Sequence, residues 1–136
     1  MAEKTVICDT DVMIDYWNRN NSRHSYTKEI LENYIGLNNI VLSAITKMEL
    51  ILGAQNKNEL VAINNNADKF NIASIDNNIT NLAITFLQDY KLSHGLALPD
   101  AFIAATAQIS GWELFTYNVK DYKFIKGLTL FDLQLS

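Results

Sequence analysis

Short apolar runs that end in a polar residue and lead into a helix-like pattern recur along this chain of 136 residues. The run at residues 6–8 is followed by Asp9 and Thr10, and the run at residues 40–42 by Ser43. All three polar residues are favourable helix caps. Strands that alternate with helices are typical of an α/β fold with right-handed crossovers. We therefore predict a central parallel sheet of four to five short strands flanked by helices, with strands at residues 6–8, 40–42, 71–75, 113–116 and 128–131.

Between these predicted strands, apolar residues recur at helical spacing. The clearest pattern covers residues 79–90, where one face is apolar, as in a helix that covers a sheet. Residues 101–109 are apolar nearly all round and end at Gly111, which predicts a buried central helix. Further helices are predicted after Asp9 or Thr10, after Ser25, after Ser43 and over residues 56–69, with loops at residues 18–25 and 92–98 and a loop or short helix at 117–126.

The composition predicts one folded domain over residues 1–136. Hydrophobic residues make up 49% and charged residues 19%, which excludes disorder of the whole chain. Every apolar run is far shorter than the roughly 20 residues that span a bilayer, and the run at residues 5–8 is too short for a signal peptide. A lone cysteine, Cys8, cannot form an internal disulfide. We therefore expect a cytoplasmic protein.

The net charge limits how this chain could meet a nucleic acid. Fifteen acidic residues against eleven basic ones leave a net charge of −4 at pH 7. This balance argues against a broad basic face that holds nucleic acid directly. A bound cation would reverse the local charge that a phosphate meets. The positions of the carboxylates therefore decide the question.

Four acids are candidate site residues because of their places on the predicted elements. Asp9 follows the first strand directly, and Asp121 comes soon after the fourth strand. Both should lie at the carboxyl ends of the strands, where ligands of parallel sheets bind. Asp100 begins the buried helix, and Glu49 lies at the edge of an apolar helix stripe. Each acid also has a structural interpretation: a helix cap for Asp9, a first-turn acid for Asp100 and a solvated side chain for Glu49.

Acids that converge on one edge of a sheet repel one another unless a cation lies among them. Their oxygen atoms suit Mg²⁺ or Mn²⁺. Such a site can activate water and stabilise a phosphodiester under attack, as metal-dependent nucleases do. No other nucleophilic apparatus competes with this one. His24 and His94 fall in predicted polar loops and should be exposed, Cys8 falls inside a strand, and glycine-rich phosphate loops are absent.

Four segments in series resemble the motifs of the PIN-domain family, and within it the VapC-type toxins of toxin–antitoxin pairs. They are residues 6–15, 43–53, 98–107 and 116–122, and their order and spacing agree with the family over nearly the whole chain. The resemblance implies a Mg²⁺-dependent endoribonuclease that hydrolyses RNA. It also implies a sheet with the first strand central, a homodimer, and a small antitoxin that blocks the acidic site.

The resemblance assigns expected roles to individual residues. Asp9 and Asp100 match the family's direct metal ligands, with Mg²⁺ or Mn²⁺ as the ion. Glu49 and the fourth acid complete the catalytic set. Because the fourth position varies among family members, it falls on either Asp121 or Asn118 here. The positions that match the family's site are the acids Asp9, Glu49, Asp100 and Asp121, with Thr10 and Asn118 as supporting polar residues.

Two alternatives stand beside this interpretation. Asp9 and Asp11 after an apolar strand also resemble the nucleophile and acid–base of haloacid-dehalogenase-like phosphatases. That family needs a further acidic motif, and the residues after Thr116 contain no Asp-Asp pair. The second alternative is a catalytically silent PIN-like binding module, which we would expect to have lost its acids. Near Asp121, a spaced basic set is either a solvated face or a group of phosphate contacts; it consists of Lys120, Lys123 and Lys126.

Overall fold

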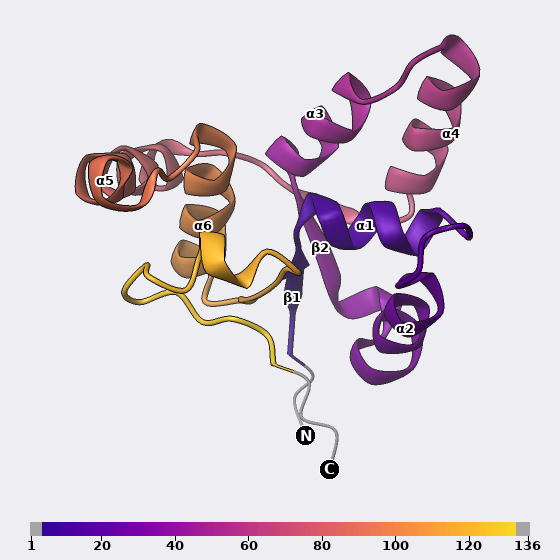
Figure 1. The fold of residues 1–136 in the computed structure, drawn as a ribbon, viewed down its shortest axis with the longest axis horizontal. Helices are drawn as coiled ribbons and strands as arrows, with labels where there is room; N and C mark the ends of the chain where they lie inside the picture. Colours follow the sequence, from indigo (N-terminus) through magenta and orange to yellow (C-terminus); the bar gives the residue numbers. More distant parts are fainter. Residues whose placement is uncertain (1–3, 133–136) are drawn as a thin grey trace.

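The computed structural model describes residues 4–132, which are built around four parallel strands: β1 (Val6–Cys8), β2 (Ile40–Ser43), β3 (Asn71–Ala73) and β4 (Glu113–Phe115). The strand order is β3-β2-β1-β4 (Figure 1). In β1, Val6 pairs with Ile40 of β2 on one side and with Glu113 of β4 on the other. The α/β class and the interior place of the first strand are therefore confirmed.

Helices cover both faces of the sheet: α1 (Thr10–Trp17), α2 (His24–Glu29), α3 (Ala44–Leu52), α4 (Lys57–Ala67), α5 (Asn77–His94) and α6 (Leu98–Ser110). Successive side chains of a strand point to opposite faces. Ile7 consequently packs with α5 and α6, whereas Val6 and Cys8 pack with α1 and the helical segment after it. Figure 1 shows α5 and α6 on one side of β1, with α1 and α2 on the other.

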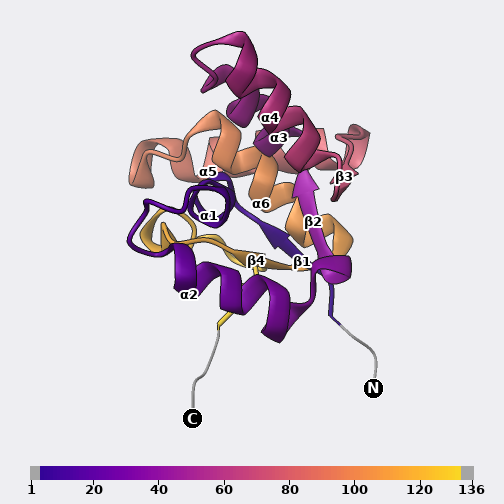
Figure 2. The same cartoon turned by 90° about the vertical axis from the view of Figure 1, so that its right-hand side faces the viewer.

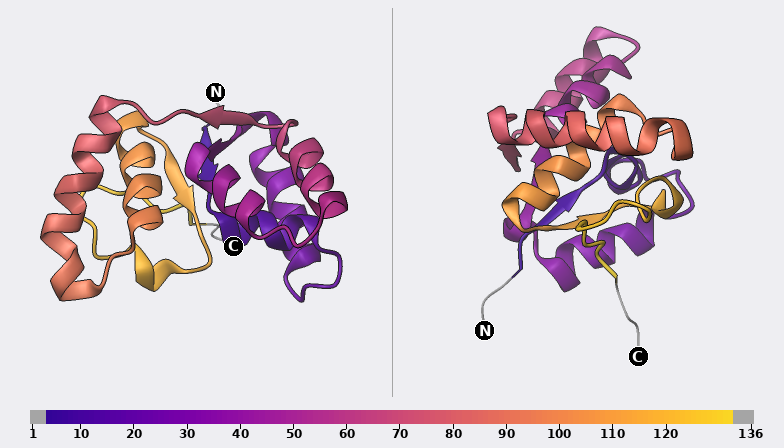
Figure 3. Two further views of the ribbon diagram at one scale, coloured as in Figure 1. Left: turned by 90° about the horizontal axis from the view of Figure 1, so that it is seen from above. Right: turned by 90° about the vertical axis from the view of Figure 1, so that its left-hand side faces the viewer.

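α6 is the buried central helix that the sequence predicts. Pro99 lies in its first turn, and Gly111 ends it with a φ of 71°. α5 lies alongside α6 (Figure 3) and is longer than predicted, since it continues to His94. The predicted loop at residues 92–98 is therefore wrong over most of its length. The last turn of α5 is mostly polar, so no apolar pattern predicts it. In the structure this turn contacts the segment after β4, because the His94 ring stacks on Phe124 with 4.1 Å between ring centroids.

The segment that follows α1 is more helical than predicted. α2 begins at His24, inside the predicted loop, and continues as a π-helix, η1 (Ile30–Ile35). Ile30 and Leu31 are buried against the Val6 and Cys8 face of the sheet. A 3₁₀ turn, η2 (Leu37–Asn39), follows η1 and leads into β2. The helix predicted after Ser25 is therefore present, although it begins before Ser25 and its second part is a π-helix.

A fifth strand at residues 128–131 does not form. This segment makes only an isolated bridge, between Leu130 and Leu114 of β4. Leu114 N donates to Thr129 O (2.9 Å), and Phe131 N donates to Leu114 O (2.8 Å). On its other side, by contrast, β4 pairs with β1 at all three of its residues. The edge of the sheet is thus covered by an extended segment without becoming a longer ladder.

α3 and α4 stand beyond the carboxyl ends of the strands. Figure 2 shows both helices above the arrowhead of β2. Ser43 caps α3 by accepting from Ile45 N, and Asn56 caps α4 by accepting from Glu59 N. This placement brings α3 to the edge of the sheet where β1 and β4 also end. No helix within residues 4–132 is both long and apolar enough to cross a bilayer.

Candidate active site

Asp9 lies at the carboxyl end of β1, and both of its carboxylate oxygens accept hydrogen bonds. Oδ1 accepts from Thr10 N (2.8 Å), which caps α1, and Oδ2 accepts from Thr116 Oγ1 (2.8 Å). The residue is only 5% exposed. Asp9 therefore serves as a helix cap and is also held by the residue that follows β4. The structural interpretation of Asp9 as a helix cap is therefore confirmed, and its place at the carboxyl end of β1 is compatible with a site residue.

Glu49 reaches the same edge from α3. Its Oε1 accepts a hydrogen bond from Thr10 Oγ1 (2.6 Å). The Thr10 hydroxyl also lies 3.2 Å from Oγ1 of the buried Thr46. Thr10 thus joins the first turn of α1 to α3 and fixes one oxygen of Glu49.

Asp100 enters from the first turn of α6 and is held by a tyrosine. The Tyr122 hydroxyl donates to Asp100 Oδ1 (3.0 Å). Tyr122 is 1% exposed, and the same hydroxyl interacts with Asp9 and lowers the pKa of that carboxyl. Burial, together with the charges of Asp9 and Asp100, raises the pKa of Tyr122 itself, so the hydroxyl remains a donor. One buried hydroxyl therefore links two of the four candidate acids.

The four candidate acids interact electrostatically. Burial raises the pKa of Asp100 to about 6, and the charges of Asp9, Asp121 and Glu49 contribute in the same direction. Burial also raises the pKa of Asp9, to which the Glu49 charge adds, although hydrogen bonds oppose the shift. Asp121 lies in a 3₁₀ turn, η3 (Val119–Asp121), after β4. The structure thus brings together acids from four separate parts of the chain.

Asp11 is a fifth acid beside this group. From the sequence, Asp11 is a candidate only as the acid–base of a haloacid-dehalogenase-like phosphatase. Its Oδ2 accepts from Tyr117 N (3.1 Å). Its Oδ1 is buried and has no hydrogen-bond partner among residues 4–132. Burial and then the charge of Asp9 raise the pKa of Asp11 to about 6. The carboxylate ties the start of α1 to the segment after β4 and increases the local negative charge.

Two residues of the site escape the sequence argument, Thr116 and Tyr122. Both lie in the segment after β4, within the stretch that carries the last family motif. Thr116 could be found as the polar residue directly after a predicted strand. Tyr122 carries no such signal, because an aromatic next to an acid is equally typical of a core or a surface position. Its role depends on burial that only the fold provides.

The remaining predicted polar residues lie around the edge of the site. Asn118 is exposed, and its backbone N–H donates to Thr116 Oγ1 (3.0 Å). The spaced basic set near Asp121 is exposed at all three positions: Lys120, Lys123 and Lys126. No ion pair of these three lysines is found within the described residues. Their side chains are therefore free to meet solvent or a ligand.

The histidines and the cysteine take no part in the acid group. Cys8 is fully buried in β1, and burial raises the pKa of its thiol. His24 Nδ1 lies 3.0 Å from the carbonyl oxygen of Asp15, at the start of α2. His94 stacks on Phe124 in the last turn of α5. Cys8 is thus a small core residue as expected, but the histidines belong to helices instead of loops.

The donor chemistry of the site fits a hard divalent cation. Among residues 4–132, no group of three or more His, Cys, Asp or Glu side chains is arranged so that it could surround one ion. Mg²⁺ usually keeps several waters and takes one or two protein carboxylates, so it does not need such a group. Asp9 and Asp100 interact with the same Tyr122 hydroxyl, burial raises the pKa of both carboxyls, and neighbouring negative charges raise them further: Glu49 for Asp9, and Asp9, Asp121 and Glu49 for Asp100. A cation between them would remove that repulsion.

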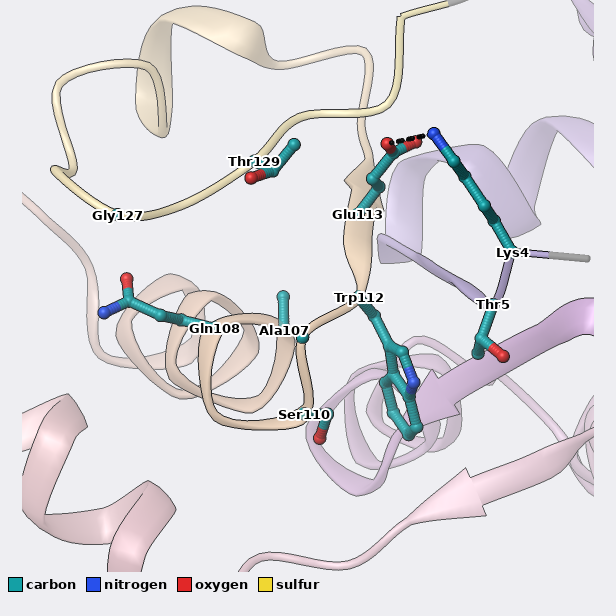
Figure 4. A pocket seen from close by; sticks show the side chains of 10 residues that line it. Lys4, Thr5, Ala107, Gln108, Ser110, Trp112, Glu113, Gly127 and Thr129 are labelled. Atoms are coloured by element: carbon teal, nitrogen blue, oxygen red, sulfur yellow. Dashed lines mark hydrogen bonds and ion pairs between the residues drawn. The ribbon is translucent and has the colours of Figure 1, made fainter. Parts of the chain in front are cut away.

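A cavity of about 500 Å³ lies at the other end of the sheet, where β1 and β4 begin. Figure 4 shows the ion pair beside it, in which Lys4 Nζ lies 3.4 Å from Glu113 Oε2. Gln108 and Trp112 also line this cavity, and none of the candidate acids does. The acids lie at the opposite edge of the sheet, where the strands end.

Comparison with known proteins places this arrangement in a family. The family model of the PIN domain matches residues 6–125, which include all four candidate acids. The chain belongs to the PIN-domain family. The family membership expected from the motifs is therefore confirmed, and it excludes the haloacid-dehalogenase alternative. A catalytically silent PIN-like binding module would belong to the same family, so a cleavage assay distinguishes it from an active nuclease.

Relatives of this PIN domain include proteins of toxin–antitoxin systems. Ribonuclease VapC1 of Methanocaldococcus jannaschii is 31% identical over 136 aligned residues, which cover 96% of this chain and 89% of the relative. A chain in a toxin–antitoxin complex from Klebsiella pneumoniae is 31% identical with a TM-score of 0.72, covering 92% of this chain and 96% of that one. DNA-bound VapBC from Salmonella typhimurium gives a TM-score of 0.77 at 18% identity, covering 95% and 98%. The last likeness concerns the fold alone.

Proposed function

We propose that this PIN domain is a metal-dependent endoribonuclease and the toxin of a toxin–antitoxin pair. The observation that supports it most is the meeting of Asp9 and Asp100 at one buried tyrosine hydroxyl, with the charges of Glu49 and Asp121 acting on the same site. Acids held this close are costly to keep unless they bind a cation. The relative named Ribonuclease VapC1 supports RNA as the substrate.

Asp9 and Asp100 would hold the cation, Mg²⁺ or Mn²⁺. When bound, such an ion supplies an activated water and stabilises the charge of a phosphodiester under attack. Thr116 orients Asp9 through its hydroxyl, and Tyr122 does the same for Asp100. Because both donors are buried, they hold the carboxylates in place before any substrate arrives.

Glu49 is the candidate acceptor for the proton of the attacking water. Its Oε1 is occupied by the Thr10 hydroxyl, whereas no donor to Oε2 is found in the described part of the chain. A carboxylate that is fixed at one oxygen and open at the other can accept a proton at a defined position. Asp121 would complete the negative group, with Asn118 at the neighbouring position. Thr10 would act as a positioning residue.

The toxin assignment includes partners that belong to the same proposal. The Klebsiella pneumoniae relative comes from a toxin–antitoxin complex, which supports a small antitoxin as the partner of this chain. An open edge lined by carboxylates suits a basic side chain of such a partner, since a guanidinium matches carboxylates with two parallel hydrogen bonds. A homodimer and a cytoplasmic location are further parts of this proposal.

Cleavage of RNA by the purified chain tests the proposal. We expect Mg²⁺-dependent cleavage of single-stranded RNA that EDTA abolishes, and a loss of about two orders of magnitude or more in Asp100→Asn, which keeps the shape of the side chain and removes the charge of a proposed ligand. Asp89→Asn is the matched control, because Asp89 is an exposed acid on α5 outside the site. Cleavage that resists EDTA, or that survives in Asp100→Asn at the level of the control, would overturn the assignment.

A further inference from the structure

Arg23 is a cation fixed beside the acid group. It is one of only two arginines in the chain and lies at the start of α2. Its Nε donates to Asp15 Oδ2 (2.8 Å), and its guanidinium carbon lies 4.1 Å from the centroid of the Tyr117 ring. Two different contacts therefore hold one guanidinium in place.

The partners of Arg23 are themselves firmly held. The side chain of Asp15 is 9% exposed, and its second oxygen accepts from Asn21 Nδ2 (2.8 Å). The Tyr117 hydroxyl bonds to the buried Thr27, and the Tyr117 ring packs edge-on against Phe115. Because these supports are buried or half-buried, Arg23 loses little further side-chain freedom when it binds something.

Arg23 lies next to the candidate active site. Tyr117, on which it stacks, directly follows Thr116, the residue that donates to Asp9. The backbone N–H of Tyr117 also donates to Asp11, and the charge of Arg23 lowers the pKa of Asp11. Figures 2 and 3 show the segment after β4 beside α1. The guanidinium thus stacks on the residue that directly follows Thr116, the hydrogen-bond donor to the proposed metal ligand Asp9.

The outer edge of this guanidinium is unused. The Arg23 side chain is 52% exposed, and within residues 4–132 no acceptor is found for its N–H groups other than Asp15 at Nε. Here the acid is buried while the arginine presents its fork of donors to solvent, at the border of a strongly acidic group.

We propose that Arg23 binds a backbone phosphate of the RNA strand, next to the phosphodiester that is cleaved. The proposal rests on the proposed function and names a contact that holds the substrate. A polyanion that approaches an acidic site on a chain of net charge −4 needs a fixed positive group nearby. A planar guanidinium binds phosphate oxygens with two parallel hydrogen bonds, which a flexible lysine cannot reproduce.

The test measures RNA binding separately from cleavage. Binding of a fluorescent single-stranded RNA is followed by anisotropy in the Asp100→Asn background, across a range of KCl concentrations and with Mg²⁺ present. Arg23→Gln is compared with Arg19→Gln, which makes the same charge change at an exposed position of the same loop. We expect Arg23→Gln to weaken binding about tenfold and to reduce the slope of log K against log salt by about 0.7, the value for one lost phosphate contact on a single strand. Arg19→Gln should leave both nearly unchanged.

Three further measurements keep the outcome decisive. Thermal unfolding shows whether loss of the Arg23–Asp15 ion pair destabilises Arg23→Gln. If Arg23→Gln does not fold, Arg23→Lys takes its place; because this variant keeps the positive charge, it should keep most of the wild-type salt slope. A salt slope that is equal in Arg23→Gln and Arg19→Gln overturns the proposal. Loss of antitoxin binding in Arg23→Gln with unchanged RNA binding also overturns it.

Cleavage assays on Arg23→Gln with Asp100 intact separate the Arg23 contact from the proposed nuclease function. If RNA binding depends on Arg23 but the protein cleaves no RNA, the Arg23 contact is supported and the nuclease function is refuted. If the protein cleaves RNA equally well with and without Arg23, the nuclease function is supported and the Arg23 contact is refuted.

Discussion

At the scale of single residues, one side chain can satisfy two requirements that the sequence presents as alternatives. Asp9 caps α1 through Oδ1 and is held through Oδ2 by a hydroxyl from the far end of the chain. The cap explains why the helix begins there, and the second bond explains why the carboxylate has a fixed orientation. The acids of this site are therefore both structural and, in our proposal, functional.

The raised pKa of Asp100 predicts how stability depends on pH. Its ordinary value is 3.8 and the folded-state value is about 6, so the folded protein binds more protons than the unfolded one between these values. The metal-free protein should therefore lose stability as pH rises from about 4 to above about 6. In Asp100→Asn this loss should be smaller, because the group that titrates is gone.

Thermal unfolding in EDTA at several pH values checks this prediction, with Asp89→Asn as the control. The control should keep the wild-type dependence on pH. If the melting temperature of Asp100→Asn depends on pH as that of the wild type does, the pKa of Asp100 is not raised in the folded protein and the electrostatic description of the site is wrong.

At the scale of elements, the site is formed where α1, α3, α6 and the segment after β4 meet. Each element contributes one acid, and hydroxyl groups join them: Thr10 joins α1 to α3, and Tyr122 joins α6 to the segment after β4. The parallel register of β1 with β2 and β4 places the carboxyl ends of these strands at the same edge of the sheet.

Removing the hydroxyl of Thr10 should disturb Glu49 without removing any acid. In Thr10→Val the side chain keeps its shape, but Glu49 Oε1 loses its donor at 2.6 Å. We expect kcat for RNA cleavage to fall about tenfold with KM nearly unchanged, as is typical of residues that position a metal site, and the free energy of unfolding to fall by about 1 kcal/mol.

Thr10→Ser is the matched control, since it keeps the hydroxyl and loses only a methyl group. Steady-state kinetics and chemical denaturation on the same preparations give both quantities. Equal kcat values for the two variants would show that the Thr10 hydroxyl does not position Glu49.

At the scale of the whole molecule, the site joins parts of the chain that are far apart in sequence, so a ligand bound there should stabilise the entire fold. Mg²⁺ or Mn²⁺ should raise the melting temperature by mass action, with a stabilisation of about 2.7 kcal/mol when the ion is present at 100 times its Kd. Asp9→Asn should lose this response, because it removes a proposed ligand.

Thermal shift assays at increasing metal concentration provide the measurement. NaCl at matched ionic strength is the control for general screening of the net charge of −4. An equal shift with NaCl, or an unchanged response in Asp9→Asn, would count against a metal site at these acids.

Expression in cells tests the toxin assignment. The wild-type chain expressed alone should arrest growth, and Asp100→Asn should not, because it lacks a proposed metal ligand. Co-expression with the adjacent small gene should restore growth and yield a stable complex with suppressed nuclease activity. Growth that is unaffected by the wild-type chain at comparable soluble levels, with no small partner in the purified protein, would contradict the toxin assignment while leaving the nuclease open to the cleavage assay.

The sequence by itself determined the alternation of strands and helices, the parallel sheet and the edge on which Asp9 lies. These features follow from short-range rules, namely the period of apolar residues and the polar residues that cap helices. The same rules fail where stability comes from distant contacts. The last turn of α5 and the single bridge in place of a fifth strand both involve packing partners elsewhere in the chain.

Only the tertiary structure decided which polar groups complete the site. Thr116 reaches Asp9 across 107 positions, Thr10 reaches Glu49 across 39, and Tyr122 reaches Asp100 across 22. No local pattern reports such pairs, because a hydroxyl has the same propensities whether its partner is water or a buried carboxylate. The stack of Arg23 on Tyr117 is of the same kind. Local sequence places each group at the end of an element, and the packing of those elements selects its partner.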